Sequence, residues 1–403
     1  MRAATWSRIV LILLAASILL YAEELELKLF NTANALLAVE IVVFGLLAFS
    51  LLILAARESP PRWINSYVLF AGCLSFLMHV GTLTSIQPYL VDTLATPQCA
   101  AELLLDGRHP YADFDMQRCL ARFNMPESFA TRLADGSVET KMPYPAGSFL
   151  FIAPFISLGV TDTRFVYAAL MILMVLLIHH RADPAVKNSV VLALVSNVVV
   201  IRFTSGGLPE PLWALPLLVA WMWRDKSLLS SSALGAALAT KQLAWFFVPF
   251  YLVMAGKEHG LREAARRASI AALIFVALNV PFAVSAPQLW ADSLLSPLLD
   301  PMLPMGSGLI ALGVSGVIPL WPKWVYVSFE SLSFLAAIGW YYWRYARYKE
   351  AAVVLATLPL WFSWRSLLSY VYLNGFFLLA GIVHQRRLVQ PAADDPVEAT
   401  NRL

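Results

Sequence analysis

The stretch ANALLAVEIVVFGLLAFSLLILAA, residues 33–56, contains one charged side chain, Glu40. A helix of about 20 apolar residues is long enough to cross the hydrocarbon core of a bilayer. Within lipid the backbone polar groups must be satisfied inside the protein, and a single segment can achieve this only as a helix. This stretch therefore predicts a membrane-crossing helix.

Apolar runs of the same kind recur along the whole chain. Of the 403 residues, 59% are hydrophobic and 14% are charged, and the mean hydropathy is +0.68. Soluble proteins have about 45–50% apolar and about 25% charged residues. The composition excludes an ordinary soluble protein and predicts an all-α integral membrane protein, a polytopic bundle of about 10–14 membrane segments. Further candidate segments are 7–22, 66–86, 165–179, 188–201, 209–223, 228–240, 242–255, 268–286, 324–343, 350–363 and 366–384.

The N-terminal segment from Arg2 to Tyr21 has a basic start and a short apolar core, as signal peptides do. No small-residue cleavage site follows it, and Glu23, Glu24 and Glu26 come next. We interpret this segment as a retained first helix.

The positions of lysine and arginine predict which helix ends face the cytoplasm. With the N-terminus inside, most basic turns also fall inside if two shorter runs rich in Gly and Pro, 147–160 and 306–320, dip without crossing. The loop from Gln87 to Ala146 then lies outside. If both runs cross, the clusters at Arg181 and Arg344 lie outside instead. Residues 1–389 form one domain in this scheme, and the polar residues 390–403 form a disordered cytoplasmic tail.

The long loop has helical periodicity of its own. Met116, Cys119, Leu120 and Phe123 share one face, while charged residues take the other. This pattern predicts an amphipathic helix on the membrane surface. Cys119 shares the loop with Cys99, so a disulfide between them can form if the loop faces an oxidising compartment.

The loop also carries the best-placed candidate for a catalytic acid or base. Asp92 follows the third apolar segment closely, where a carboxylate can face both a lipid-borne substrate and water. The alternative is that Asp92 is a solvated loop charge, like the other acids of the loop. These are Glu102, Asp106, Asp113, Asp115, Glu127, Asp135 and Glu139.

Three cations fall on the external side against the usual bias. They are Arg202, Lys241 and Arg365, each bordered by apolar runs. A charge near hydrocarbon is costly and tends to persist only with a partner, so the three together indicate a bound anion. The alternative is that each side chain extends to headgroup phosphates.

The order of several motifs adds a resemblance to these observations. After Asp92 come GRHPY (107–111), MPYPAGSFLFIAPF (142–155), ALGAALATKQLAWFFVP (233–249) and the pair Ser363–Trp364. This order resembles the GT-C superfamily of membrane glycosyltransferases, and most closely glycosyltransferase family 87, which depends on polyprenyl-phosphate-mannose. The chain departs from the family pattern in having Ala146 after Tyr144–Pro145, GGLPE at 206–210, and Arg365 after Ser363–Trp364.

The resemblance implies inverting transfer of a hexose, mannose in the family, from a polyprenyl phosphate to a lipid-linked or glycan acceptor. The active site would face the periplasm or exterior of a bacterial plasma membrane. A carboxylate can take the proton of the acceptor hydroxyl, which is the role of Asp92. Cations stabilise the leaving phosphate. The implied phosphate contacts are Lys241, Arg202 and Arg365, and the implied substrate pocket is formed by Tyr111, Tyr144, Arg108 and Glu210.

Two other classes of function remain open. A transporter or flippase for a lipid-linked sugar would use ionisable groups along its path, such as Glu40, His79 and Glu330. A glycan ligase or polymerase is the other, although we expect its main external loop later in the chain. We expect no cofactor; a divalent metal at His109 with Asp106, Asp113 or Asp115 is the less favoured alternative. A net charge of +3, spread over short loops, gives no nucleic-acid footprint.

Overall fold

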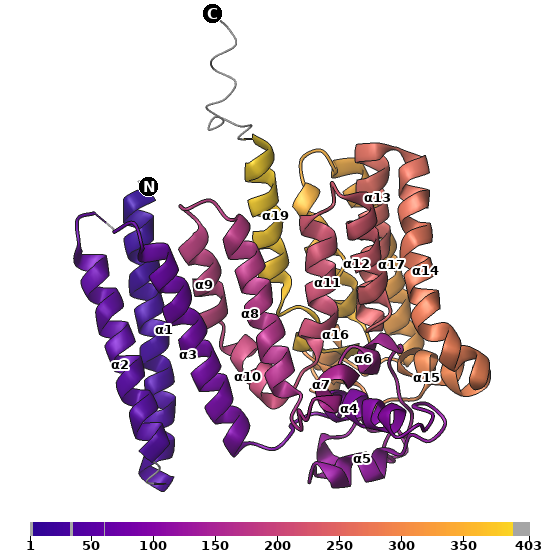
Figure 1. The fold of residues 1–403 in the computed structure, drawn as a ribbon. Coiled ribbons are helices and arrows are strands. Elements are labelled where there is room, and N and C mark those ends of the chain that lie inside the picture. The colour runs from indigo at the N-terminus through magenta and orange to yellow at the C-terminus, as the bar shows by residue number, and fades with distance from the viewer. Residues whose placement is uncertain (1–2, 33–34, 60, 390–403) are drawn as a thin grey trace, which may run out of the picture.

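The computed structural model describes residues 3–32, 35–59 and 61–389, and the tail predicted for residues 390–403 lies outside them. The described chain is mostly helical, which confirms the predicted all-α class. Long helices stand roughly parallel, and a layer of short helices and loops covers one end of them (Figure 1).

A three-helix unit lies at one side of the molecule and consists of α1 (Ala3–Thr32), α2 (Ala35–Ala56) and α3 (Ile64–Ile86). α1 is longer than the apolar run that predicted it because its acidic end finds a partner. Glu24 Oε2 lies 3.1 Å from Nε2 of the buried His79 on α3. Tyr21 stacks on the same imidazole ring, so polar contacts tie α1 to α3.

The middle of the chain consists of α8 (Arg164–Arg181), α9 (Lys187–Val195) and α10 (Val198–Gly206). α9 and α10 are bent by 57° at the break between them. Asn197 lies in this break, and its Oδ1 accepts the backbone N–H groups of Val199 and Val200, which caps α10. The predicted segment 188–201 is therefore two short helices.

The second half of the bundle contains α11 (Glu210–Met222), α12 (Ser227–Leu238), α13 (Val248–His259), α14 (Leu261–Ser285) and α17 (Lys323–Arg344). A Cβ atom on Gly235 of α12 would lie 2.6 Å from the carbonyl oxygen of Ala271 on α14, so this glycine permits a close helix contact. The 3₁₀ turn η2 (Gln242–Phe247) precedes α13, and Lys241 lies between α12 and this turn in extended conformation.

The C-terminal region is less regular than predicted. The predicted segment 350–363 is three short pieces, namely η3 (Lys349–Ala351), α18 (Ala352–Leu355) and η4 (Leu358–Phe362). Pro359 lacks a backbone N–H, and the Ser363 hydroxyl donates to the carbonyl of Leu360 and ends the run. The predicted segment 366–384 starts with η5 (Leu368–Tyr370) and becomes continuous only in α19 (Asn374–Val389).

By length and composition, four of the described helices could cross a membrane, or five if α9 and α10 form one bent span. The four are α2, α3, α8 and α14. α11 and α12 are apolar but have only 13 and 12 residues, fewer than the roughly 20 that a straight crossing needs. The two shorter runs form brief helices only, α6 (Gly147–Leu150) with α7 (Ala153–Ser157), and α16 (Leu309–Val314).

Short elements cover one end of the bundle, at the bottom of Figure 1. The predicted external loop supplies α4 (Asp92–Leu105), α5 (Met116–Arg122) and η1 (Glu127–Phe129), and later segments supply α15 (Pro287–Leu299) and α16. The strands β1 (Met305–Gly306) and β2 (Arg365–Ser366) pair in parallel, with Met305 opposite Arg365. Segments far apart in sequence thus meet in this layer.

The apolar face of α5 packs on α4, and not on a membrane surface as predicted. Met116, Cys119 and Leu120 are buried. Cys119 is joined to Cys99 of α4 by a disulfide, with the two Cα atoms 5.9 Å apart. Because α4 occupies the face that a surface helix would turn to lipid, the apolar side of α5 is buried within the protein, while its charged side, with Arg118 and Arg122, is exposed.

The opposite end of the bundle carries ion pairs, two between segments and one within α14. They are Arg224 with Glu350, Lys349 with Glu258 and Arg267 with Glu263, at N–O distances of 2.6, 3.0 and 2.8 Å. Arg181 also donates to the carbonyl of Met222 there, at 3.0 Å. The basic turns that the lysine and arginine bias assigned to one face therefore share one end of the bundle, away from α4 and α5 (Figure 1).

Candidate functional site

Asp92 is the first residue of α4 and is only 7% exposed. Its Oδ2 accepts the backbone N–H of Thr131 at 2.6 Å. Burial raises the pKa of Asp92 above its ordinary value, and the hydrogen bond from Thr131 and the charge of Arg365 oppose this only in part. A buried carboxylate with a raised pKa is well suited to accept a proton from a bound hydroxyl.

Lys241 lies in the break after α12 and forms a buried ion pair. Its Nζ is 2.6 Å from Oε1 of Glu210, the first residue of α11. Glu210 is fully buried, and its Oε2 has no hydrogen-bond partner among the described residues. Lys241 is extended between two helical segments, and this conformation directs its side chain to the carboxylate.

Tyr144 lies between the acid and the ion pair. The Lys241 ammonium is 5.4 Å from the centre of its ring, and Tyr111 donates to its backbone carbonyl at 2.8 Å. Burial and the negative charges of Asp92 and Glu210 raise the pKa of Tyr144 well above its usual value. The phenol therefore keeps its proton and can act as a hydrogen-bond donor.

Arg365 reaches the same place from near the C-terminal end of the chain. Its guanidinium N–H groups contact the sulfur atoms of Met302 and Met305, each at 3.2 Å. Within the described ranges no carboxylate lies at ion-pair distance from it, although its charge acts on Asp92 and on Tyr144. We call Asp92, Tyr144, Glu210, Lys241 and Arg365 the Asp92 cluster.

Two glycines allow the segments that carry the cluster to approach one another. Gly147 donates its N–H to the carbonyl of Ala239 at 2.7 Å, and a Cβ atom there would lie 2.5 Å from that oxygen. Gly306 has a φ of +130°, and a Cβ atom there would lie 2.0 Å from the carbonyl oxygen of Ser366. A larger residue at either position would push apart the backbones that bring the cluster together.

Two amide side chains fix the segment on both sides of Tyr144. Gln242 Nε2 donates to the carbonyls of Pro143 and Leu294, at 2.6 and 2.9 Å. Asn279 Oδ1 accepts the N–H of Ala146 at 3.0 Å. The segment that carries Tyr144 is thus bound to η2 and α14, and Gln242 also links η2 to α15.

The structure does not bring every predicted site residue into the cluster. Arg202 lies on α10 with an exposed side chain, which fits its alternative role as a contact to headgroups. Arg108 is also exposed, with its guanidinium 3.9 Å from the carboxylate of Asp113. Tyr111 contacts the cluster through the hydrogen bond from its hydroxyl to the backbone carbonyl of Tyr144.

The neighbourhood of His109 does not resemble a metal site. Its Nδ1 accepts the N–H groups of Tyr111 and Ala112, and its Nε2 lies 2.9 Å from the hydroxyl of Ser285. Both ring nitrogens are therefore engaged. In the part of the chain that the structure describes, no group of three or more His, Cys, Asp or Glu side chains could hold a metal ion.

Nothing in the sequence distinguishes Glu139 from the other acids of the loop. It is 3% exposed, and Lys141 beside it extends to Asp300, with Nζ 2.6 Å from Oδ2. Burial, together with the nearby Asp300, raises the pKa of Glu139. Its partner Asp300 is distant in sequence, so local spacing could not reveal the pair.

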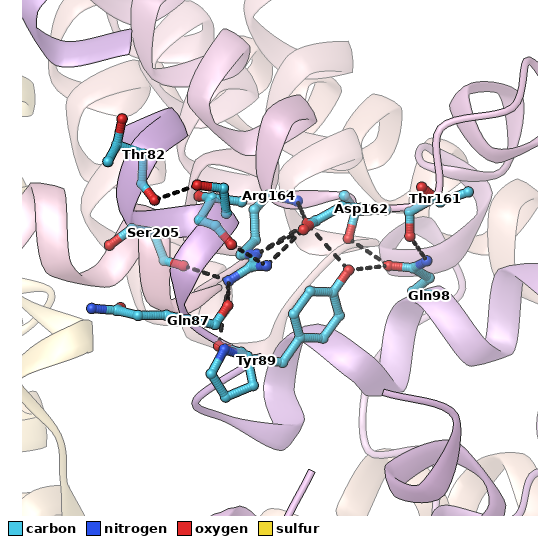
Figure 2. A network of polar contacts seen from close by, with 12 residues as sticks. Thr82, Gln87, Tyr89, Gln98, Thr161, Asp162, Arg164 and Ser205 are labelled. Carbon is cyan, nitrogen blue, oxygen red and sulfur yellow. Dashed lines mark hydrogen bonds and ion pairs between the residues drawn. The ribbon is translucent and has the colours of Figure 1, made fainter. Parts of the chain in front are cut away.

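A second group that the sequence analysis missed surrounds Arg164 at the start of α8 (Figure 2). The side chain is only 5% exposed and is paired with Asp162. The available signal was the string Thr161–Asp162–Thr163–Arg164, where two charges stand at the junction between a loop and an apolar helix.

The Asp92 cluster combines two carboxylates with two cations. Because Glu210 neutralises Lys241, the remaining opposite charges are those of Asp92 and Arg365. Such an arrangement can remove a proton from a hydroxyl group and hold an anion beside it.

Comparisons with family models, with curated proteins and with solved structures find no match for this chain. The geometry of the Asp92 cluster and the order of the sequence motifs are therefore the basis for assigning a function.

Proposed function

We propose that this chain is an inverting membrane glycosyltransferase of the GT-C type, similar to family 87. It transfers a hexose, mannose by resemblance, from a polyprenyl phosphate to a lipid-linked or glycan acceptor. The bundle lies in a bacterial plasma membrane, with the apolar helices of spanning length crossing it, and the Asp92 cluster faces the periplasm or exterior. The observation that carries the proposal is that Asp92, Lys241 and Arg365, from distant segments, gather at one end of an apolar bundle.

The reaction is one displacement at the anomeric carbon. Asp92 takes the proton from the acceptor hydroxyl, and the hydroxyl oxygen forms a bond to the anomeric carbon. The bond from that carbon to the phosphate oxygen breaks, and its electron pair leaves with the polyprenyl phosphate. A phosphate is a good leaving group and needs no general acid. A single displacement inverts the anomeric centre.

Lys241 and Arg365 stabilise the charge that grows on the leaving phosphate. Arg365 has neutral sulfur atoms as neighbours, so its charge is available to an anion. The Lys241 ammonium has three N–H donors, so it can donate to a phosphate while it remains paired with Glu210. The protonated phenol of Tyr144 can donate to the same group. This combination of charges suits a phosphate better than a neutral sugar alone.

An apolar groove between helices of the second half of the bundle suits the isoprenoid tail of the carrier. Its volume is about 370 Å³, and it is lined by residues of α12, η2, α13 and α14, including Leu234, Leu238, Trp245, Leu252 and Phe275. Leu238 precedes Lys241 by three residues and Trp245 follows it by four, so we propose that the carrier enters along this groove with its phosphate toward Lys241.

The exposed faces of the long helices support a bundle embedded in lipid. On α2, the side chains of Val39, Leu46, Phe49 and Ile53 are between 60% and 68% exposed. A stripe of large apolar side chains in water is unfavourable and marks a contact with lipid or protein.

Purified chain in lipid vesicles, supplied with a radiolabelled polyprenyl-phosphate hexose and membrane acceptors, tests the proposal. We expect transfer by the wild type, and Asp92→Asn to lower it by at least about 100-fold, as loss of a general base does. Asp106→Asn is the matched control, because Asp106 follows the other end of α4 and is exposed.

Wild-type turnover in Asp92→Asn would remove the catalytic assignment. Movement of the labelled lipid between leaflets, without a new glycosidic bond, would favour a flippase instead.

A further inference from the structure

Arg164 uses its whole guanidinium group to hold the chain that leads to Asp92. Nη1 donates to the carbonyls of Gln87 and Pro88 at 2.8 and 3.3 Å, and to that of Ser205 at 3.0 Å. Nη2 donates to the carbonyl of Thr84 at 3.0 Å. These carbonyls lie at the C-terminal ends of α3 and α10, where helices have unpaired carbonyl groups. A cation there also interacts favourably with the helix dipole.

Asp162 fixes the orientation of this guanidinium. Its two carboxylate oxygens accept from Nε at 3.0 Å each, and Oδ2 accepts from Nη2 at 2.7 Å. Tyr89 covers the planar group, with the guanidinium carbon 4.8 Å from the centre of its ring. Figure 2 shows the guanidinium between the carboxylate on one side and the backbone of residues 87–89 on the other.

The same corner also holds α4 on the far side of Asp92. Gln98 Oε1 accepts the Tyr89 hydroxyl at 2.8 Å and the Thr163 hydroxyl at 3.0 Å. Gln98 Nε2 donates to the carbonyl of Thr161 at 2.8 Å. Residues 161–164 thus bind the backbone before Asp92 and the helix after it (Figure 2).

We propose that Arg164 is a positioning residue for Asp92: together with Asp162 and Gln98 it fixes both flanks of the acid, so that the carboxylate stays buried opposite Arg365 and Tyr144. The inference rests on the proposed function only in treating Asp92 as the base. Arg164 itself touches no atom of the Asp92 side chain, so its effect travels through residues 87–91.

A measurement on Asp92 that requires no sugar substrate tests the proposal. The full chain in detergent is treated with a water-soluble carbodiimide and an amine over a range of pH, and modification of each carboxyl group is read by mass spectrometry. Exposed Asp106 is the internal reference. In the wild type we expect Asp92 to react slowly and with a midpoint above that of Asp106, because burial raises its pKa.

Arg164→Gln is expected to move the midpoint of Asp92 down by about one pH unit or more, toward the ordinary aspartate range. Arg164→Lys keeps the charge next to Asp162 but cannot reach four carbonyls, so we expect it to restore stability and to restore the midpoint only in part. Arg365, whose charge acts on Asp92, and the neutral phenol of Tyr144 are unchanged in both variants. Where transfer is assayed, kcat is expected to fall while KM for the donor is kept.

Two further variants keep the test decisive if Arg164→Gln does not fold. Tyr89→Phe removes the hydroxyl that binds Gln98, and Gln98→Leu removes the hydrogen bonds of the amide to Tyr89, Thr161 and Thr163; both leave the ion pair of Arg164 with Asp162 intact. The matched control is Arg122→Gln, because Arg122 also binds α4, through Glu102 at 2.7 Å, but from the exposed side.

An unchanged midpoint of Asp92 in all folded variants, or an equal shift in Arg122→Gln, overturns the positioning role. Absence of transfer by the wild type would overturn the proposed function but leave the modification result intact.

Discussion

Two aspartates at the two ends of α4 have opposite surroundings. Asp92 is buried at the start of the helix, and Asp106 is exposed just after its end. Their sequence contexts are similar, since each borders the same apolar helix. The position of Asp92 after a long apolar segment predicted an acid near the membrane surface, but only tertiary packing against Thr131 explains its burial.

The raised pKa of Asp92 has a consequence for stability. Because its pKa is higher in the folded than in the unfolded chain, the group contributes stability below its unfolded pKa of about 3.9. That contribution is lost as pH rises through the folded pKa. Asp92→Asn should therefore stabilise the chain at pH 7, by about 1.4 kcal/mol for each unit of the shift, and make little difference near pH 4.

Thermal unfolding in detergent, followed by thiol labelling of Cys73, measures this effect. Cys73 is the free cysteine that the structure describes. Asp106→Asn should leave the transition unchanged at both pH values. A lower transition temperature for Asp92→Asn at pH 7 would contradict the expectation.

The pair of Lys241 with Glu210 predicts a non-additive result. Lys241→Met leaves a fully buried carboxylate without its partner and should destabilise the fold by about 3–5 kcal/mol. Glu210→Gln added to it removes the charge and should recover most of that loss. Neither variant should recover transfer, because the phosphate contact is gone.

A double-mutant cycle with the same unfolding measurement, run beside the transfer assay, checks this expectation. Additive stability effects would mean that the ion pair is not coupled. Full transfer by the double variant would exclude Lys241 from the phosphate site.

At the scale of elements, the disulfide between Cys99 and Cys119 fastens α5 to α4 across 20 residues of chain. Closing a loop of this length stabilises a protein by about 3 kcal/mol in the chain-entropy account. Replacing both cysteines by alanine should lower the unfolding temperature and make residues 106–118 more sensitive to protease. Peptide mapping after limited proteolysis, with Arg122→Gln as a variant that keeps the disulfide, measures the effect. Unchanged cleavage would contradict it.

Gly147 sets the contact between α6 and the end of α12. Gly147→Ala puts a methyl group against a backbone oxygen that cannot move aside, so we expect a loss of about 1–3 kcal/mol and weaker transfer. Gly45→Ala is the matched control, because a Cβ atom on this helical glycine meets no atom within 4 Å. Equal unfolding temperatures for the two variants would show that the contact is not tight.

Hydropathy predicted the long helices better than the short elements. The run at 33–56 became α2 nearly residue for residue, since an apolar helix of bilayer length has no alternative structure. The run at 350–363 broke into short turns, because Pro359 and Ser363 interrupt it. The face of α5 was predicted correctly, but periodicity cannot tell whether lipid or α4 covers it.

At the scale of the whole molecule, the Asp92 cluster lies at one end and the basic turns lie at the other. In sealed cells, a membrane-impermeant maleimide should label Asp135→Cys from outside. It should label Ala185→Cys, in the turn between α8 and α9, only after permeabilisation. Labelling of both from the same side would contradict the proposed orientation, and with it the site.

The long-range pairs were beyond prediction from one sequence. Lys241 and Arg365 could be singled out because charges between apolar runs are costly. The local sequence did not indicate that Glu210 pairs with Lys241, or that methionine sulfur atoms contact Arg365. It also did not indicate that Arg202 lies apart from the Asp92 cluster. Those outcomes depend on which helix ends meet, which a hydropathy profile does not contain.

The pairing of β1 with β2 closes the chain on itself. The segment from Ser307 to Trp364, which includes α17, begins directly after β1 and ends directly before β2. The ladder joins the two ends of this segment, and Arg365 is part of the ladder. Insertions or deletions between Ser307 and Trp364 can therefore change the shape of this segment while the position of the Arg365 guanidinium is kept.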